Sequence, residues 1–343
     1  MTRSNARRRK CQRLRSIRGA ACFHLVFIIT LIGLMTMVIG CGEESRSAPG
    51  ASEPDGLKIV CLSPAITQMI IDMGYGDRLV GVAQSDPAAK SDSLGLPVCG
   101  NYLSPDIERI VSLEADMVLT ESASGELPDG LQDLVEAGVL TVKTIEHARS
   151  IGEVGDVLTR PENGLGVILG DMQAAQRVRR LMEARAQAVG AAVADRPRPR
   201  VLMLVGTSPL QVLGPGATHH ELLAQAGGVN AAASLGRDYA HIDREKLVEL
   251  RPDVILILSA GAPPLTENDS RLEALQGVPV PAVMNDRIHL LSYAQIQLPT
   301  STLARVIAEM AKAIHPDIAE PIEQAYESAG RLDESPAALE MGG

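Results

Sequence analysis

The sequence predicts an α/β protein with two Rossmann-like lobes, each built on a parallel sheet, joined by one long backbone helix. Three observations support this fold class. Short apolar segments alternate with helical ones from residue 57 onward, which is typical of parallel α/β sheets. A proline-free segment rich in helix-forming residues, 166–195, divides the chain. The stretch 102–123 returns in recognisable form, without a gap, at 239–260.

The first 40 residues predict a lipoprotein signal peptide. Eight basic residues and no acid precede the apolar run LVFIITLIGLMTMVIG, which ends at Cys41. The end of this run resembles the lipobox of bacterial lipoproteins, in which the cysteine is lipidated. An uncleaved signal anchor is the alternative, but the run is short for a spanning helix. We therefore expect a protein on the periplasmic side of a bacterial membrane, anchored to the inner or the outer membrane through Cys41.

A flexible tether is expected over residues 41–56, which are rich in Ser, Pro, Gly and Glu. Loss of the signal peptide would make the chain more acidic than its overall net charge of −10, so we expect no nucleic-acid partner. Cys61 and Cys99 remain, and an extracytoplasmic setting permits a disulfide between them, although sequence leaves open whether they meet.

Residues 57–165 predict the N-terminal α/β lobe. Ser63 and Pro64 follow the first strand and are typical of an N-cap and a first helical residue. Further strands are expected at 78–86, 96–100 and 116–120, with a short helix at 105–113. After the linking helix at 166–195, the C-terminal lobe is expected over 196–320, and residues 321–343 are expected to form a disordered tail.

The repeated stretch suggests a ligand site and a docking site. In open parallel sheets, ligands bind outside the carboxyl ends of the strands, so the copies would lie on opposite walls of a cleft between two facing lobes. Tyr102 corresponds to Tyr239, and Glu108 corresponds to Glu245. Trp is absent and both Phe lie near the N-terminus, so the core does not need these tyrosines. We expect the tyrosines to face the cleft and the glutamates to lie at the outer end of each lobe.

The order of elements, with the segments KIVCLSPAITQMIIDMGYGDRLVGV, DIERIVSLEADMVL, PGATHHELLAQAGGVN and DREKLVELRPDVILI, resembles the periplasmic substrate-binding proteins of ABC importers for cobalamin and ferric siderophores. The resemblance covers residues 57–315. It implies two lobes on a rigid backbone helix, a monomer, and delivery of the ligand to a permease and its ATPase. It also implies that Glu108 and Glu245 engage arginines of the permease, and that Tyr102, Tyr239 and Tyr293 contact the ligand.

Weaker candidates and rival functions remain. Thr218 and Glu221 match a capping box, which would place His219 and His220 in a first helical turn near the cleft. Ser63 and His219 are therefore weaker ligand candidates. The ligand is expected to be a metal chelate, with no resident cofactor or metal. A haem receptor, a metal-ion receptor and a ligand-sensing lipoprotein without transport are the alternatives. An enzyme is not expected, because G-x-S-x-G, H-E-x-x-H and Walker A motifs are missing.

Overall fold

The computed structural model describes residues 56–90, 94–121, 127–266 and 268–333. The predicted signal peptide, Cys41 and nearly all of the tether therefore lie outside the described residues. Within the described part, no helix is both long enough and apolar enough to cross a membrane.

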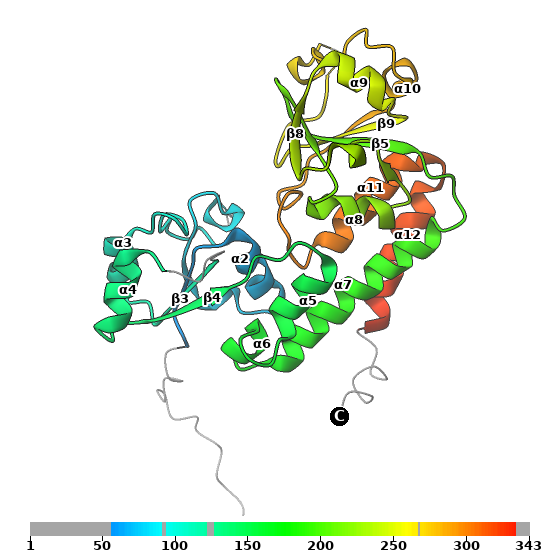
Figure 1. Cartoon of the computed structure of the whole chain (residues 1–343). Helices are drawn as coiled ribbons and strands as arrows, with labels where there is room; N and C mark the ends of the chain where they lie inside the picture. The colour runs from blue at the N-terminus through cyan, green and yellow to red at the C-terminus, as the bar shows by residue number, and fades with distance from the viewer. Residues whose placement is uncertain (1–55, 91–93, 122–126, 267, 334–343) are drawn as a thin grey trace, which may run out of the picture. The chain divides into compact units, whose positions relative to one another are not determined.

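The N-terminal lobe contains a four-stranded parallel sheet (Figure 1). The strands lie in the order β2-β1-β3-β4 and have the bounds β1 Ile59–Cys61, β2 Leu79–Val82, β3 Met117–Glu121 and β4 Thr141–Ile145. Alternate residues of β1 face different cores, because Ile59 packs with helix α2 (Pro64–Asp72) whereas Val60 packs with Ile110 of α3 (Ile107–Ser112). Helices therefore cover both faces of this sheet, as a parallel sheet requires.

The segment 96–100, expected to be a strand, forms only two isolated bridges, between Val98 and Val82 and between Gly100 and Pro105. Two features of its sequence explain the difference. Pro97 has no backbone N–H to donate to a ladder, and Gly100 has a φ of 82°, outside the strand region. Helices α4 (Asp129–Glu136) and α5 (Ile151–Thr159) complete the lobe.

The expected linking helix is broken near its start. Helix α6 (Leu165–Ile168) ends before Gly170, whose φ is 75°, and α7 runs over Met172–Ala192. Asp171 starts α7 because its side chain accepts a hydrogen bond from the backbone N–H of Ala174 at 2.8 Å. The prediction of one helix over 166–195 is therefore wrong at its first turn, where glycine and an N-cap residue adjoin.

The C-terminal lobe has a six-stranded sheet in the order β10-β9-β5-β6-β8, with β7 beside β5. Its strands are β5 Arg200–Thr207, β6 Leu210–Leu213, β7 Val229–Asn230, β8 Tyr239–Ile242, β9 Val254–Leu258 and β10 Ile288–Leu291. Strands β5, β7, β9 and β10 are parallel, whereas β6 and β8 are antiparallel to their neighbours. Only two residues join β5 to β6, and so short a connection can join only antiparallel strands.

Helices α8 (Thr218–Gln225) and α11 (Leu303–Ile314) pack on one face of this sheet, and α9 (Arg244–Leu250) and α10 (Pro281–Met284) pack on the other. One core cluster includes residues of β1, α7, β9 and α11, so apolar contacts run from one lobe through α7 into the other. The α/β fold with two lobes and a long linking helix is thus confirmed, but the prediction of a parallel sheet is wrong for the C-terminal lobe, whose sheet is mixed.

The chain continues as helix α12 (Ala319–Asp333), which lies along α7 in Figure 1. The prediction of a disordered tail is therefore wrong for residues 321–333. Ile322, Tyr326 and Ala329 lie at i, i+4 and i+7, on one helical face, and Ile322 is fully buried. This apolar spacing indicates a helix, whereas the largely polar composition of residues 321–343 suggested disorder.

The repeated stretch folds in the same way in both lobes. Helix α3 and strand β3 in the first copy match α9 and β9 in the second. Between helix and strand, Glu114 and Arg251 both have a positive φ, of 52° and 43°. Asp116 then accepts a hydrogen bond from the backbone N–H of Lys58 at 2.8 Å, and Asp253 accepts one from that of Arg200 at 2.8 Å.

Cys61 and Cys99 are free and buried. Cys61 of β1 packs in the core that contains α2, whereas Cys99 packs with Val60 on the opposite face of the sheet. Strand β2 also separates them, because Val82 pairs with Cys61 on one side and with Val98 on the other. Two strand spacings, about 9 Å, exceed the reach of a disulfide.

Candidate functional site

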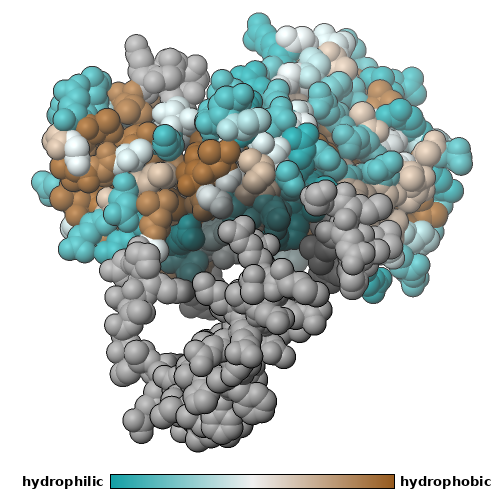
Figure 2. Space-filling view, turned by 90° about the horizontal axis from the view of Figure 1, so that it is seen from below, coloured by the Kyte–Doolittle hydropathy of each residue, from teal (hydrophilic) through white to brown (hydrophobic). Residues whose placement is uncertain are grey.

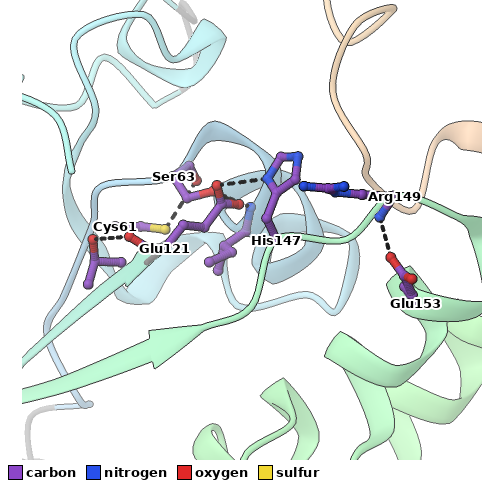
Figure 3. Close-up of polar contacts among 8 residues, drawn as sticks. Cys61, Ser63, Glu121, His147, Arg149 and Glu153 are labelled. Carbon is purple, nitrogen blue, oxygen red and sulfur yellow. Dashed lines mark hydrogen bonds and ion pairs between the residues drawn. The ribbon is translucent and has the colours of Figure 1, made fainter. Parts of the chain in front are cut away.

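Three polar side chains meet at the carboxyl edge of the N-terminal sheet (Figure 3). Ser63 follows β1, Glu121 ends β3, and His147 follows β4. The Ser63 hydroxyl donates a hydrogen bond to Glu121 Oε1 at 2.7 Å, and His147 Nδ1 lies 3.2 Å from Glu121 Oε2. The strand order β1-β3-β4 brings these residues together although they are far apart in sequence. We call them the Ser63–Glu121–His147 cluster.

The carboxylate sets the state of the histidine. Because a carboxylate oxygen accepts, Nδ1 of His147 carries the proton in this contact. The hydrogen bond to Glu121 raises the pKa of His147, although partial burial acts in the opposite direction. Half of the imidazole side chain is exposed, at 51%. With Nδ1 held by Glu121, the other ring nitrogen, Nε2, is left for a further partner.

Ser63 is confirmed as the N-cap of α2, since its hydroxyl oxygen accepts a hydrogen bond from the backbone N–H of Ile66 at 3.3 Å. The residue is only 2% exposed. Its hydroxyl therefore both caps the helix and orients Glu121. A direct contact between Ser63 and a ligand stays a prediction, and burial does not favour it.

A cavity of about 370 Å³ adjoins the cluster on the side of helix α5. His147 and Arg149 both line it, and Figure 3 shows their side chains beside each other. The backbone N–H of Arg149 donates to Glu153 Oε2 at 2.6 Å, while its guanidinium finds no acceptor among the described residues. The exposed cation of Arg149 thus lies beside the imidazole, in a lining that also contains the carboxylates of Glu146 and Glu153.

The predicted ligand tyrosines fall into two groups. Tyr102, in a loop, and Tyr239, at the start of β8, are 46% and 57% exposed. Exposure of this extent is unusual for core tyrosines and fits the expected role, which stays a prediction. Tyr293 follows β10, is half-buried, and lines a different cavity with Tyr326. The fifth tyrosine, Tyr75, donates a hydrogen bond from its hydroxyl to Asp171 at 2.9 Å, a structural contact.

Both predicted docking glutamates are exposed and lie just inside a helix start. Glu108 follows the N-cap Asp106 of α3, and Glu245 follows the N-cap Asp243 of α9. One turn after each glutamate lies an exposed valine, Val111 at 45% and Val248 at 39%.

Each lobe therefore presents a carboxylate and an apolar side chain at i and i+3 on one helix. In the view of Figure 2, apolar side chains gather mainly on the side that contains the N-terminal lobe.

The expected capping box at the start of α8 is wrong. The N-cap is Ala217, so Thr218 is already helical and makes no side-chain cap. His219 is buried, and its Nε2 lies 2.6 Å from the carbonyl oxygen of Ile296. Burial lowers the pKa of His219. His219 thus lies in the first turn of α8, as expected, and its buried imidazole joins this helix to the segment after β10. A contact between His219 and a ligand stays a prediction.

Sequence reasoning did not identify Glu121 and His147 as site residues. Each follows or ends a strand, which is a signal for the ligand edge of an α/β sheet. Their contact depends on the lateral order of strands, which the sequence does not reveal. Among the described residues, no three His, Cys, Asp or Glu side chains form a group that could hold a metal ion.

The chain is similar in sequence to known proteins. The family model described as "Periplasmic binding protein" matches residues 59–293, more than half of the chain. The chain is 25% identical over 266 residues to "Uncharacterized ABC transporter substrate-binding lipoprotein YvrC" of Bacillus subtilis (strain 168), covering 76% of this chain and 80% of the relative. It is 24% identical over 201 residues to "Vitamin B12-binding protein" of Salmonella paratyphi A, covering 58% and 71%.

Among solved structures, the fold matches "Periplasmic heme-binding protein RhuT from Roseiflexus sp. RS-1 in apo form". The TM-score is 0.60 at 25% identity, and the match covers 80% of this chain and 99% of the other. The resemblance identified from the sequence is thereby confirmed at the level of family and fold.

Proposed function

Because this chain belongs to the periplasmic binding protein family, we propose that it is an extracytoplasmic receptor that captures a metal chelate and delivers it to an ABC permease and its ATPase. The chelate classes are cobalamin, haem and ferric siderophores. Names of similar proteins support the first two, since one relative is called a vitamin B12-binding protein and a structural match is called a heme-binding protein. The ligand would bind at the carboxyl edges of the two sheets.

The Ser63–Glu121–His147 cluster is the observation that carries the proposal of a metal chelate. Histidines that bind metals usually donate their other ring N–H to a carboxylate, which fixes the ring and makes it a better ligand. His147 has this arrangement, with Glu121 as the carboxylate. A metal already held by a chelate needs only one further ligand from the protein. Haem iron offers an open axial position, and the haem carboxylates suit Arg149. Haem is therefore the favoured alternative to cobalamin and ferric siderophores.

The first test is a ligand screen on the chain beginning at Gly42. Calorimetry with cyanocobalamin, hemin and a ferric hydroxamate should give one clear binder, and hemin should show an absorption change if His147 binds iron. His147→Ala should weaken hemin binding at least about tenfold. His241→Ala, at an exposed histidine of β8, is the matched control and should have no effect. Failure of all three chelates to bind would reject the proposal.

The tyrosines are tested separately. Tyr102→Ala, Tyr239→Ala and Tyr293→Ala should each weaken binding of the identified chelate by about 1 to 3 kcal/mol, the range of a lost aromatic contact. The matching Phe variants keep the ring and should lose much less. Because Tyr102 and Tyr239 are exposed, their substitution should leave thermal stability nearly unchanged. Unchanged affinity in all three Ala variants would contradict the assignment.

Membrane attachment is proposed to depend on Cys41. Replacement by Ser removes the thiol that a lipid would modify, so Cys41→Ser protein should be released from membranes or remain unprocessed. Fractionation and mass spectrometry of the N-terminus measure this directly. Normal processing with unchanged attachment would show that the anchor is something else.

A sensor role without transport would show itself as ligand binding with no loss of uptake when the gene is deleted.

A further inference from the structure

A second cavity, of about 460 Å³, lies among helices α2, α7, α11 and α12. Its walls combine an apolar strip from α7 with charged and hydroxyl groups from the other elements. The volume is within the range of small-molecule sites, which are mostly apolar with a few placed polar groups. It contains none of the Ser63–Glu121–His147 cluster. We call it the α7 cavity, and its apolar strip consists of Val178, Leu181 and Met182.

Arg185 brings an unneutralised positive charge to the α7 cavity. Its Nε is buried without a hydrogen-bond partner, and its guanidinium makes no ion pair with any described residue. The guanidinium lies 4.7 Å from the ring centroid of Tyr326, which holds it in place. A buried donor without an acceptor is costly and calls for a partner.

The other cation of the α7 cavity is already neutralised. Arg305 contacts Glu309 at 2.8 Å and Glu323 at 2.5 Å, and Lys312 contacts the same two carboxylates at 2.9 and 2.7 Å. Two cations and two anions therefore balance one another. Arg185 is thus the cation in the lining that a bound molecule could neutralise.

Asp72 brings a negative charge to the same cavity. Its carboxylate accepts hydrogen bonds from Gln68 at 2.8 Å and from the hydroxyl of Ser301. Burial raises the pKa of Asp72, while those hydrogen bonds and nearby Arg185 act in the opposite direction. Asp72 and Arg185 make no ion pair, although both line the cavity. Two opposite charges therefore face one space without touching.

We propose that the α7 cavity binds a small zwitterion, an α-amino acid with an apolar side chain. Its carboxylate would receive the paired N–H donors of Arg185, and its ammonium would donate to Asp72. The apolar side chain would lie along Val178, Leu181 and Met182. The α7 cavity shares Tyr293 with the proposed chelate contacts. The zwitterion proposal rests instead on Arg185 and Asp72, which have no part in the chelate proposal, so variants of these two residues test it separately.

The test uses the full chain in mild detergent. Calorimetry and thermal unfolding are measured with L-leucine, L-methionine and L-phenylalanine. Two analogues of leucine are measured as well: 4-methylpentanoate, which lacks the ammonium group, and 3-methylbutylamine, which lacks the carboxylate. At least one amino acid should bind and raise the unfolding temperature. When leucine binds, the acid and the amine should each bind at least about tenfold more weakly, since each loses one charged contact.

Variants identify the site. Arg185→Gln and Asp72→Asn should each reduce affinity for the bound amino acid at least about tenfold. Asp72→Asn keeps an oxygen that accepts from Gln68, and its new amide N–H can donate to the Ser301 hydroxyl, so this variant should fold even if Arg185→Gln does not. Arg177→Gln, at an exposed arginine of the same helix, is the matched control and should bind normally. Three results would each overturn the proposal. They are that no amino acid binds the wild type, that 4-methylpentanoate binds as tightly as leucine, or that both Arg185→Gln and Asp72→Asn bind the amino acid normally.

Discussion

At the scale of single residues, burial decides the chemistry of His219. Its Nε2 lies 2.6 Å from a backbone carbonyl oxygen, which can only accept, so Nε2 carries the proton and the neutral ring suffices for the contact. Burial lowers the pKa of His219 below its ordinary value of 6.5. The unfolded chain therefore takes up a proton on this residue before the folded chain does as the pH falls.

The first prediction concerns the pH dependence of stability. Because the unfolded state binds more protons, the free energy of unfolding should decrease as pH falls through about 6.5. His219→Gln keeps an N–H donor and removes the titration, so it should reduce this slope. Denaturant unfolding between pH 7.5 and 5.5 measures it. Burial also lowers the pKa of His289 and His315, so part of the slope should remain.

An identical slope in wild type and His219→Gln would show that protonation of His219 is not coupled to unfolding.

Individual site residues were predictable only where their role is local. Ser63 could be identified as an N-cap because the signal lies within three residues of the helix start. The pairing of Glu121 with Ser63 and with His147 spans 58 and 26 residues and arises from strand order. No local pattern contains that order. The burial of His219 could not be predicted because the backbone carbonyl that its ring contacts belongs to Ile296, which is 77 residues away in the sequence.

At the scale of elements, the repeated unit of helix, turn and strand is the most regular feature of the chain. In each copy an aspartate before the strand accepts the backbone N–H of the residue at or just before the start of the neighbouring strand, β1 or β5. This contact fixes where the two strands begin to pair. Repetition of the sequence allowed the match between copies to be predicted, because the same residues meet the same local requirements.

The second prediction is that the two aspartates contribute equally. Asp116→Ala and Asp253→Ala should each lower the free energy of unfolding by about 1 to 3 kcal/mol, since each leaves a backbone N–H without its charged acceptor. The Asn variants keep an acceptor oxygen and should lose less. Asp133→Ala, at an exposed position of α4, is the control. A large effect in one copy and none in the other would show that the copies are not energetically equivalent.

Element boundaries were less predictable than element types. The break between α6 and α7 depends on one glycine and one capping aspartate, a weak signal inside a helix-forming composition. The antiparallel strands β6 and β8 have only four residues each, which is too short for composition to indicate their direction. Helix α12 was missed because only one of its faces is apolar, and that face becomes visible only against α7.

At the scale of the whole molecule, the repeated unit places one acidic helix start in each lobe. The proposed role of Glu108 and Glu245 is to dock on the two halves of a permease. Each has an exposed valine one turn away, so each contact would combine a charge with a small apolar surface. When a receptor docks at two points, removing either point should reduce transport by more than the loss of a single exposed ion pair would.

The third prediction separates docking from ligand binding. Glu108→Ala, Glu245→Ala and the double variant should lower uptake in cells, and the double variant should lower it most. Affinity of the purified protein for its ligand should stay the same, because neither glutamate belongs to the Ser63–Glu121–His147 cluster. Glu136→Ala, at an exposed glutamate of α4, is the control for uptake. Normal uptake in the double variant would leave the repeat as a trace of lobe duplication only.

The two buried cysteines have a practical consequence. Both Cys61 and Cys99 belong to the N-terminal lobe and are 0% exposed, and the sequence has no cysteine after residue 99. Burial raises the pKa of the Cys61 thiol to about 12 and that of Cys99 to about 11, so neither reacts while the lobe is closed. In the chain that begins at Gly42, which lacks Cys11, Cys22 and Cys41, alkylation by a maleimide therefore times the unfolding of the N-terminal lobe alone. If labelling in mild denaturant is faster than the loss of the helical signal, the lobes unfold separately. If labelling and loss of the helical signal coincide, the two lobes unfold as one cooperative unit.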